Sequence, residues 1–190
     1  MATRIETDRL VIRSMSETDL ADFTAIVENV NVAQPAGFQA TRTEFETHFL
    51  LQQTLHQRWI WGIELAETHQ LIGTIGLYGR SDENGRLARG ERDLGYMLNE
   101  AFWGRGYMSE AVVAVLNYGF DHGLQAILGS YFADNTRSAG IFTKCGFQFT
   151  HQLQHDETDF FAPGKVERFY KLTPLDFWRA TGPQDSANNQ

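Results

Sequence analysis

The sequence predicts an α/β domain of the α+β kind, in which helices flank a central, twisted, mixed and mostly antiparallel sheet. Two observations lead to this fold class. Short apolar or alternating runs, typical of strands, interchange with longer segments whose apolar residues recur every three or four positions, as in helices. In addition, 42% of the 190 residues are hydrophobic and 14 are phenylalanines, enough to bury a full core. Because no repeat or internal boundary interrupts the chain, we expect one domain over residues 1–180 and a disordered tail over 181–190.

The elements expected in the first half follow from apolar spacing and turn residues. Ser16, with Asp19 three positions later, is typical of the start of a helix, while Pro35 and Gly37 interrupt regular structure. The predicted elements are, in order, a strand over residues 9–15, a helix with Leu20, Phe23 and Val27 on its apolar face, an irregular segment over 29–40, a helix over 43–57, a hairpin of strands over 59–65 and 71–78, and a charged loop over 80–90.

The second half continues the alternation of strands and helices. A strand is expected before each of two glycine-containing segments, and a helix after each of them. The predicted elements are, in order, a strand over 93–98, a helix whose apolar face holds Met108, Ala111, Val112, Val115, Leu116, Gly119 and Phe120, a strand over 126–132, a helix that ends near Gly146, and strands over 148–153 and 165–172 separated by a loop containing Pro163 and Gly164.

Residues 103–110 read Trp-Gly-Arg-Gly-Tyr-Met-Ser-Glu and stand where a predicted strand gives way to a helix. A helix N-terminus has unpaired amide protons and about half a positive charge, so it attracts a phosphate or pyrophosphate, and glycines let the backbone approach it closely. Two familiar nucleotide-binding loops do not fit, because Tyr107 stands where a P-loop has lysine and Ser109 where a dinucleotide-binding loop has its third glycine. An ordinary turn that binds nothing is the remaining alternative.

A second cluster, residues 134–147, reads Asp-Asn-Thr-Arg-Ser-Ala-Gly-Ile-Phe-Thr-Lys-Cys-Gly-Phe. Together the two segments resemble the GNAT superfamily of acyl-CoA-dependent N-acetyltransferases. In that superfamily a Gln/Arg-x-x-Gly-x-Gly/Ala loop is followed by Asn-x-x-Ser/Ala and by a helix ending in Lys-x-Gly-Phe. This chain has Ala101 at the first loop position, so Arg105 is expected to supply the charge there instead.

The chain is more closely similar to the ribosomal-protein N-terminal acetyltransferases of the RimJ/RimL type. Those chains open with a Thr-Asp/Glu-Arg-Leu-x-Ile/Leu-Arg strand, present here at residues 7–13, and carry a Gly-Tyr-x-Leu strand, present here at 95–98. The similarity runs to about Asp176 and covers the whole domain. It implies a GNAT-type fold with a splayed strand pair at the cofactor site, and direct transfer of an acetyl group from acetyl-CoA to an amine.

The resemblance also implies which residues hold acetyl-CoA as co-substrate. In the family, a splayed strand turns a free backbone amide toward the thioester carbonyl, the glycine loop holds the pyrophosphate, and the asparagine binds the pantetheine arm. The residues expected to bind acetyl-CoA are therefore Met97, Leu98, Gly104, Arg105, Gly106, Tyr107, Met108, Ser109, Asn135 and Ser138.

Three residues are expected to take part in catalysis. Asp93 lies where the nearest relatives place an acidic residue, and Glu91 shares its face because strand side chains alternate. We expect this pair to receive the proton of the amine through a water molecule, unless both belong to a solvated acidic edge of the sheet. The RimJ/RimL resemblance implies that Ser138 protonates the departing thiolate. Its alternative role is the cap or first turn of a helix.

The acceptor is expected to be the N-terminal α-amine of a protein or peptide. An α-amine has a pKa of about 7.7 to 8.0 and is partly neutral at cytoplasmic pH, whereas a lysine side chain, at about 10.4, calls for a stronger base. The alternatives are a small amine, such as an antibiotic, a polyamine or an amino acid, and a non-catalytic module that only binds acyl-CoA. Residues 32–38, the helix over 43–57 and the loop over 156–164, with Phe160 and Phe161, are expected to wall the acceptor pocket.

Composition limits the other functions. The net charge of −8 disfavours nucleic acid as a partner and mildly favours a cationic substrate. The sequence has no apolar run long enough to cross a membrane and no signal-peptide core, and Cys145 is its only cysteine, so we expect a cytoplasmic protein in which Cys145 only packs. His151 and His155 are four apart, a metal spacing only on a helix, so no metal is expected. Both a monomer and a homodimer fit the sequence.

Overall fold

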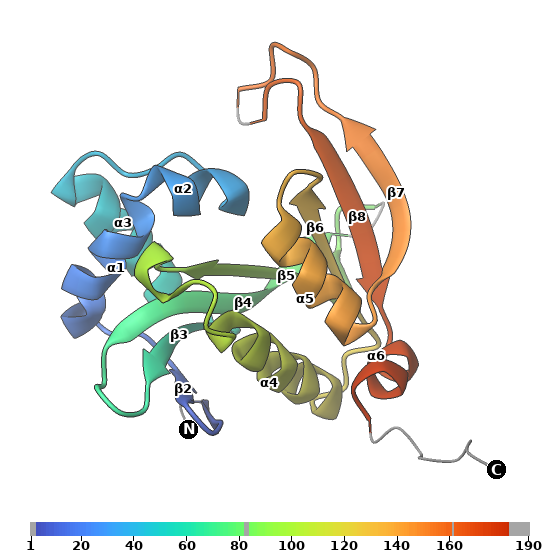
Figure 1. The fold of residues 1–190 in the computed structure, drawn as a ribbon, viewed down its shortest axis with the longest axis horizontal. Coiled ribbons are helices and arrows are strands. Elements are labelled where there is room, and N and C mark those ends of the chain that lie inside the picture. The colour runs from blue at the N-terminus through green and yellow to red at the C-terminus, as the bar shows by residue number, and fades with distance from the viewer. Residues whose placement is uncertain (1–2, 82–83, 161, 183–190) are drawn as a thin grey trace.

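Eight strands form one mixed sheet in the described part of this computed structural model, residues 3–81, 84–160 and 162–182 (Figure 1). The strands are β1 (Arg4–Glu6), β2 (Leu10–Arg13), β3 (Ile60–Leu65), β4 (Leu71–Ser81), β5 (Leu87–Leu98), β6 (Ala126–Phe132), β7 (Gln148–Gln154) and β8 (Val166–Leu172). The α-helices are α1 (Leu20–Val27), α2 (Val30–Ala33), α3 (Glu44–Leu55), α4 (Tyr107–Asp121), α5 (Thr136–Cys145) and α6 (Pro174–Thr181), and short 3-10 turns are η1 (Glu17–Asp19), η2 (Gln34–Ala36) and η3 (Glu100–Phe102).

The sheet has the order β1-β2-β3-β4-β5-β6-β8-β7, and every neighbouring pair is antiparallel except β5 with β6. The predicted mixed, mostly antiparallel sheet is thereby confirmed. Residues 91–93 of β5 pair with residues 126–128 of β6, and the two strands then separate. Because β5 stays paired with β4 as far as Leu98, its other edge has no neighbouring strand over residues 94–98. This is the splayed strand pair.

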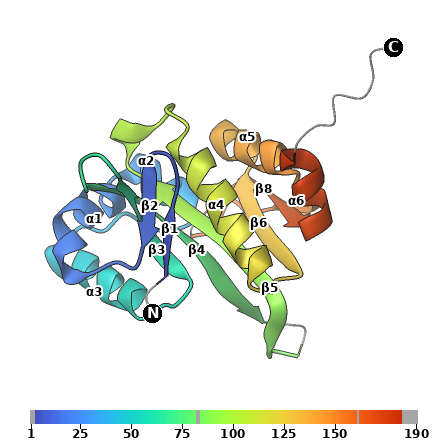
Figure 2. The ribbon, with the colours of Figure 1, turned by 90° about the horizontal axis from the view of Figure 1, so that it is seen from below.

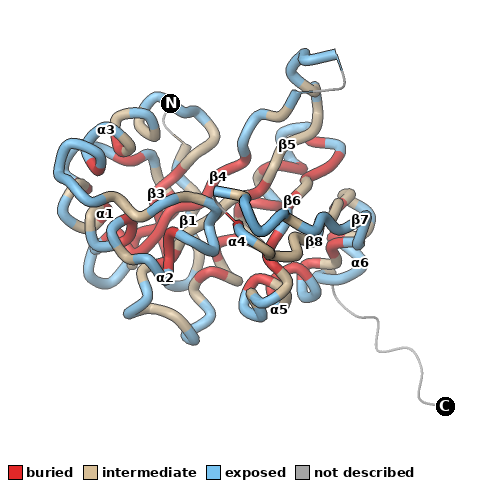
Figure 3. Tube along the Cα trace, turned by 90° about the horizontal axis from the view of Figure 1, so that it is seen from above, coloured by how far each residue is buried: buried red, intermediate tan, exposed pale blue. Residues whose placement is uncertain are grey.

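Helices cover the sheet on both sides. The helices α1, α2 and α3 lie over one face of its N-terminal half, and α4 crosses the opposite face (Figures 1 and 2). Two separate apolar cores result. One core contains Phe23, Ile26, Leu51 and Leu71 beneath α1 and α3, and the other packs the buried faces of α4, α5 and α6 against the sheet. Figure 3 shows buried residues concentrated along the central strands and on the inner faces of the helices.

The apolar face predicted for the helix after the glycine loop is confirmed. All seven of its predicted members are buried in α4: Met108, Ala111, Val112, Val115, Leu116, Gly119 and Phe120. Gly119 has a specific packing role, because a Cβ there would lie 2.9 Å from the Leu77 side chain in β4. The absence of a side chain at this position lets α4 lie close to the sheet, which in turn fixes the N-terminus of α4 beside the end of β5.

Several expected boundaries were wrong. The predicted loop over 80–90 is in large part strand, since β4 runs to Ser81 and β5 begins at Leu87, with residues 82–83 outside the described ranges. This ribbon extends beyond the rest of the sheet (Figure 3) and exposes much of its surface, so no apolar alternation marks it in the sequence. Part of the irregular segment over 29–40 forms α2 and η2, and β1 and α6 were not predicted. Of the predicted tail, residues 183–190 lie outside the described residues.

Candidate active site

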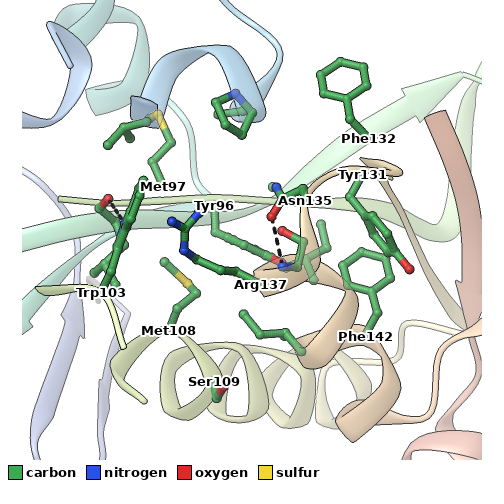
Figure 4. Close-up of a pocket in the computed structure, with 18 of the residues that line it drawn as sticks. Tyr96, Met97, Trp103, Met108, Ser109, Tyr131, Phe132, Asn135, Arg137 and Phe142 are labelled. Carbon is green, nitrogen blue, oxygen red and sulfur yellow. Dashed lines mark hydrogen bonds between the residues drawn. The ribbon is translucent and has the colours of Figure 1, made fainter. Parts of the chain in front are cut away.

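A cavity of about 500 Å³ lies where β5 and β6 separate (Figure 4). Five parts of the chain surround it: the end of β5, the loop and first turn of α4, the end of β6 with the first turn of α5, the α2–η2 segment, and β8. The residues that line it include Val32, Pro35, Ala36, Gly37, Tyr96, Met97, Leu98, Trp103, Gly104, Gly106, Tyr107, Met108, Ser109, Ser130, Phe132, Asn135, Arg137, Ser138 and Glu167. The splayed strands thus form two walls of one concave site.

The first turn of α4 opens into this cavity. Gly106 is the residue that precedes the helix, and its φ of +81°, like the +75° of Gly104, is a left-handed conformation that favours glycine. No side chain caps the helix here. The first-turn amides and the positive end of the helix dipole are therefore available to an anion. Five of the predicted cofactor residues, Gly104, Gly106, Tyr107, Met108 and Ser109, line the cavity at this end.

The cation at this end of the cavity is Arg137. Arg105, predicted from the loop, is exposed, lies with its Cζ 5.6 Å from the Phe102 ring centre and is absent from the lining. Arg137, in the first turn of α5, lines the cavity with its Cζ 3.9 Å from the centre of the Trp103 ring. No role for Arg137 was predicted from the sequence. The pattern that could have indicated it is a cation two residues after Asn135, at the start of the predicted helix.

Asn135 and Ser138 are brought together at the N-terminus of α5. The Oδ1 of Asn135 accepts a hydrogen bond of 3.1 Å from the backbone amide of Ser138, so Asn135 caps the helix. Ser138 is buried in its first turn, and both residues line the cavity, where Figure 4 shows Asn135. Asn135 therefore does cap the helix. Because the cap uses the backbone amide of Ser138, the Ser138 hydroxyl is left for another partner.

Tyr96 presents a buried hydroxyl group to the same region. Its Oη is removed from solvent and has no hydrogen-bond partner among the described residues. Burial raises the pKa of Tyr96 to about 12, and the neighbouring Ser138 hydroxyl opposes the rise only in part. The phenol is therefore protonated at neutral pH and has a proton to donate. A buried donor without a partner is costly to a protein.

Met97 and Leu98 occupy the predicted position on the open edge of β5. Both line the cavity, and they pair on their other side with Thr74 and Gly73 of β4. The approach of the two strands is close at this point, because a Cβ on Gly73 would lie 2.4 Å from the Met97 carbonyl oxygen. The backbone of β5 is thus held rigidly on one side and is open on the other.

The two carboxylates predicted as bases lie on β5 just before the strands separate. Asp93 accepts a 3.0 Å hydrogen bond from Arg80, and Glu91 accepts one of 3.0 Å from Lys171. Asp93 lines a second hollow on the sheet, next to Arg80 and Ser130, and neither acid lines the main cavity. The structure therefore leaves their catalytic role a prediction.

The predicted pocket walls are found in part. The α2–η2 segment lines the cavity through Val32, Pro35, Ala36 and Gly37, as expected for residues 32–38. No described residue of α3 or of the loop over 156–164 belongs to the lining. In that loop Phe160 is 73% exposed, and Phe161 lies outside the described residues.

One carboxylate, Glu167 of β8, does line the cavity among the described residues. Sequence reasoning missed it because β8 is a distant segment that reaches the site only through its pairing with β6. In the described part of the chain no group of three or more His, Cys, Asp or Glu side chains is arranged to hold a metal ion, and no helix is long and apolar enough to span a membrane. Cys145 is buried, and burial raises the pKa of its thiol to about 11, so it packs in the core as a neutral side chain.

Comparisons with known proteins agree with this geometry. Residues 9–148 match a family model described as an acetyltransferase (GNAT) domain. The uncharacterized N-acetyltransferase YoaA of Bacillus subtilis (strain 168) is 33% identical over 150 residues, which cover 76% of this chain and 82% of that protein. The crystal structure of a GNAT-family acetyltransferase from Bacillus anthracis superposes with a TM-score of 0.76 at 22% identity, covering 90% of this chain and 98% of that one. The structure of RimL, the ribosomal L7/L12 α-N-protein acetyltransferase, solved with coenzyme A, superposes with a TM-score of 0.72 at 17% identity. It covers 90% of this chain and 98% of that one. This chain belongs to the GNAT family of acetyltransferases.

Proposed function

We propose that this enzyme transfers the acetyl group of acetyl-CoA directly to the N-terminal α-amine of a protein or peptide. One observation carries the proposal: the uncapped first turn of α4 and the unpaired edge of β5 open into the same cavity. The first suits the pyrophosphate of coenzyme A and the second suits its amide-containing pantetheine arm. The solved complex of RimL with coenzyme A, which has a similar fold, supports acetyl-CoA as the co-substrate.

The residues proposed to bind acetyl-CoA are those predicted from the sequence, with one addition. The amides of the α4 turn, from Gly104 to Ser109, would hold the pyrophosphate, and Arg137 would add a positive charge beside it. Asn135 would contact the pantetheine arm. Because the Leu98 carbonyl already accepts a hydrogen bond from Trp103, the backbone amides at Met97 and Leu98 would be the groups that contact the pantetheine arm and stabilise the negative charge that develops on the thioester oxygen.

The leaving thiolate needs a proton, and two hydroxyl groups are placed to supply it. Ser138 was predicted for this role, and the buried, protonated Tyr96 hydroxyl, whose pKa the Ser138 side chain influences, supports a second donor. We propose that these two groups share the task of stabilising and protonating the thiolate. Asp93 and Glu91 remain the predicted acceptors of the amine proton, although each is already paired with a cation.

The acceptor class rests on the magnitude of amine pKa values and on fold neighbours. An α-amine needs little help to lose its proton near neutral pH. Similar folds occur in ribosomal-protein acetyltransferases, including the ribosomal-protein-S5-alanine acetyltransferase of Vibrio fischeri. A small amine is the second candidate, since one cofactor site serves many acceptor pockets across a fold. We expect the reaction to take place in the cytoplasm.

The proposal is tested by titrating acetyl-CoA into the purified protein calorimetrically and then following free thiol with a panel of acceptors. The panel holds peptides with free N-terminal Ala, Ser or Thr, the same peptides with blocked N-termini and an internal lysine, and small amines. Thiol release with free N-termini alone is the expected result. Release only with lysine or small amines refutes the proposed acceptor, and binding without any release points to a module that only binds acyl-CoA.

A further inference from the structure

We propose that Glu167 is the group that receives the proton of the attacking amine, with His155 and Asp159 as the residues that position it. The inference rests on the acetyl transfer proposed above. It assigns the base to β8 and to the β7–β8 hairpin rather than to the acids of β5.

A continuous chain of hydrogen bonds leads from the cavity into this hairpin. Ser130 Oγ donates to Glu167 Oε1 at 2.5 Å, and His155 Nε2 lies 2.9 Å from Glu167 Oε2. The other ring nitrogen of His155 lies 3.2 Å from Asp159 Oδ2. Both carboxylate oxygens of Glu167 are therefore fixed, one from β6 and one from the hairpin. A side chain held by two partners has little freedom to leave its position.

These hydrogen bonds lie beside the point where β5 and β6 separate, which is where the proposed reaction takes place. Leu128 is the last residue of β6 that pairs with β5, and Ser130 lies two residues farther along, on the open part of the strand. Ser130 and Glu167 both line the main cavity, while Ser130 also lines the hollow beside Asp93. The Glu167 side chain keeps 20% of its surface exposed, so an incoming amine can reach it.

The immediate partners of Glu167 distinguish it from the acids of β5. Asp93 and Glu91 are neutralised by Arg80 and Lys171. Among the described residues, no Lys or Arg lies within 4.0 Å of the Glu167 carboxylate, whose ionic partner is His155. A histidine, unlike Lys or Arg, loses its charge as the pH rises, and the carboxylate then has its full affinity for an ammonium group and for a proton, which suits it to bind and deprotonate a cationic substrate.

The transfer balances with this assignment. The amine nitrogen forms a bond to the acetyl carbonyl carbon while the bond from that carbon to sulfur breaks. The ammonium group first gives one proton to a Glu167 oxygen, from which it passes to solvent. The thiolate takes a proton from the Ser138 or Tyr96 hydroxyl, and the second proton lost by nitrogen restores that hydroxyl. The products are an amide, free coenzyme A thiol and one proton released to solvent.

The surroundings of Glu167 set the expected pH dependence. The hydrogen bonds that protonated His155 donates to Glu167 and Asp159 raise the pKa of His155 above its ordinary value, so His155 stays protonated to higher pH. Lys165 of the same hairpin forms an ion pair with Asp134 and also lies 5.0 Å from the Phe132 ring. At high pH His155 loses one of its two ring N–H donors, and with it one of the hydrogen bonds to Glu167 and Asp159, so activity depends on both Glu167 and His155.

The test compares Glu167→Gln with Asp93→Asn and Glu91→Gln, with Glu67→Gln in the exposed β3–β4 turn as the matched control. Coenzyme A affinity and the pH profile of kcat/KM on an acceptor of the wild-type enzyme are measured for each. We expect Glu167→Gln to lower kcat by about 100-fold or more, to remove the acid limb of the profile and to keep the dissociation constant for coenzyme A within about twofold. A positioning variant, His155→Gln, should lower kcat less and shift the profile, and Glu167→Asp should recover part of the activity.

Each outcome bears on the assignment. Full activity in Glu167→Gln together with loss in Asp93→Asn places the base on β5 and overturns the inference. Loss of coenzyme A binding in Glu167→Gln shows a structural role and also overturns it. If the wild-type protein acetylates no amine at all, the proposed function fails first and this inference fails with it, whereas an active wild type with an active Glu167→Gln refutes only the inference.

Discussion

The guanidinium group of Arg137 lies over the ring of Trp103, with Cζ 3.9 Å from the ring centre. The contact joins the first turn of α5 to the loop that precedes α4. Trp103 is itself fixed, because its Nε1 donates a 2.8 Å hydrogen bond to the Leu98 carbonyl at the end of β5. A cation stacked on an aromatic ring keeps its charge while losing conformational freedom, so Arg137 is preorganised beside the end of the cavity proposed to hold the phosphates.

Replacing Arg137 with Gln should weaken coenzyme A binding by about tenfold to a hundredfold. The reason is the loss of a charge-assisted hydrogen bond, which contributes roughly 1.5 to 3 kcal/mol. Calorimetric titration at low and high salt measures both the affinity and its ionic-strength dependence, which should be shallower in the variant.

Arg105→Gln tests the cation predicted from the loop, and Arg179→Gln, on the exposed surface of α6, is the control. Arg105 is exposed outside the cavity lining, so its variant should lose less affinity than Arg137→Gln. The reverse order would restore Arg105 as the main phosphate ligand.

Tyr96→Phe should lower turnover and raise stability together. The substitution removes a buried hydroxyl with no partner, which should increase the free energy of unfolding by about 1 kcal/mol. It also removes a proposed proton donor, which should reduce kcat by about tenfold to a hundredfold. Tyr118→Phe serves for comparison, since the Tyr118 hydroxyl is bonded to Thr3 and lies away from the cavity. Equal kcat in Tyr96→Phe and wild type would leave Ser138 as the sole proposed donor.

Gly73→Ala and Gly140→Ala form a pair with opposite expected effects on urea unfolding. At Gly73 the added Cβ meets the Met97 carbonyl at 2.4 Å, which should cost about 1 to 3 kcal/mol and disturb the open edge of β5. At Gly140, inside α5, nothing lies within 4 Å of the added carbon. Alanine there should stabilise the helix by about 0.5 to 1 kcal/mol. A stable Gly73→Ala protein with normal coenzyme A affinity would show that the strand contact is not tight.

Stability should fall in acid because of a buried charge cluster around Arg13. The guanidinium binds Asp19 at 2.7 Å and Glu64 at 2.5 Å. Burial raises the pKa of Asp19, but the hydrogen bonds from Arg13 and Ser16 outweigh it and hold the pKa below its ordinary value. For Glu64 burial is likewise outweighed, here by the hydrogen bonds from His69 and Arg13, and its pKa is lowered. Because both folded-state pKa values are depressed, their stabilisation is present above about pH 4 and is lost as the pH falls below it.

Asp19→Asn tests this cluster. We expect about 2 to 3 kcal/mol lower stability at neutral pH and a shallower decline between about pH 5 and pH 2, measured by urea unfolding at several pH values. Glu28→Gln, exposed at the end of α1, is the control and should follow the wild-type curve. An Asp19→Asn curve parallel to that of the wild type would contradict the role assigned to this carboxylate.

Much of the fold was predictable because it rests on local signals. The apolar face of α4 and the glycines before it predict a helix, and its N-terminus has no side-chain cap. The ribbon formed by the end of β4 and the start of β5 was not predictable, since its exposed strands carry charges on both faces and pair without burying apolar residues. The helix α6 was missed although Thr173 caps it and Pro174 starts it, a pattern that was readable but short.

The candidate site divides in the same way. Residues of the glycine loop, with Asn135 and Ser138, were found because each lies at a helix start with its own sequence pattern. In the sequence Tyr96 stands out only as part of a strand, and the burial of its hydroxyl without a partner depends on how the neighbouring elements pack. Glu167 was missed because its proximity to Ser130 depends on strand pairing between distant segments. Contacts of that kind leave no pattern along a single chain.

The short pairing of β5 with β6 has a mechanical consequence. The two strands share three residue pairs before they diverge, so one short stretch of pairing, here called the seam, joins the two halves of the sheet. A pantetheine chain bonded to the open edge of β5 would act as a surrogate strand and extend that seam. We therefore expect the empty enzyme to flex about the seam and the loaded enzyme to stiffen, so that the substrate itself supplies part of the rigidity needed for its own reaction.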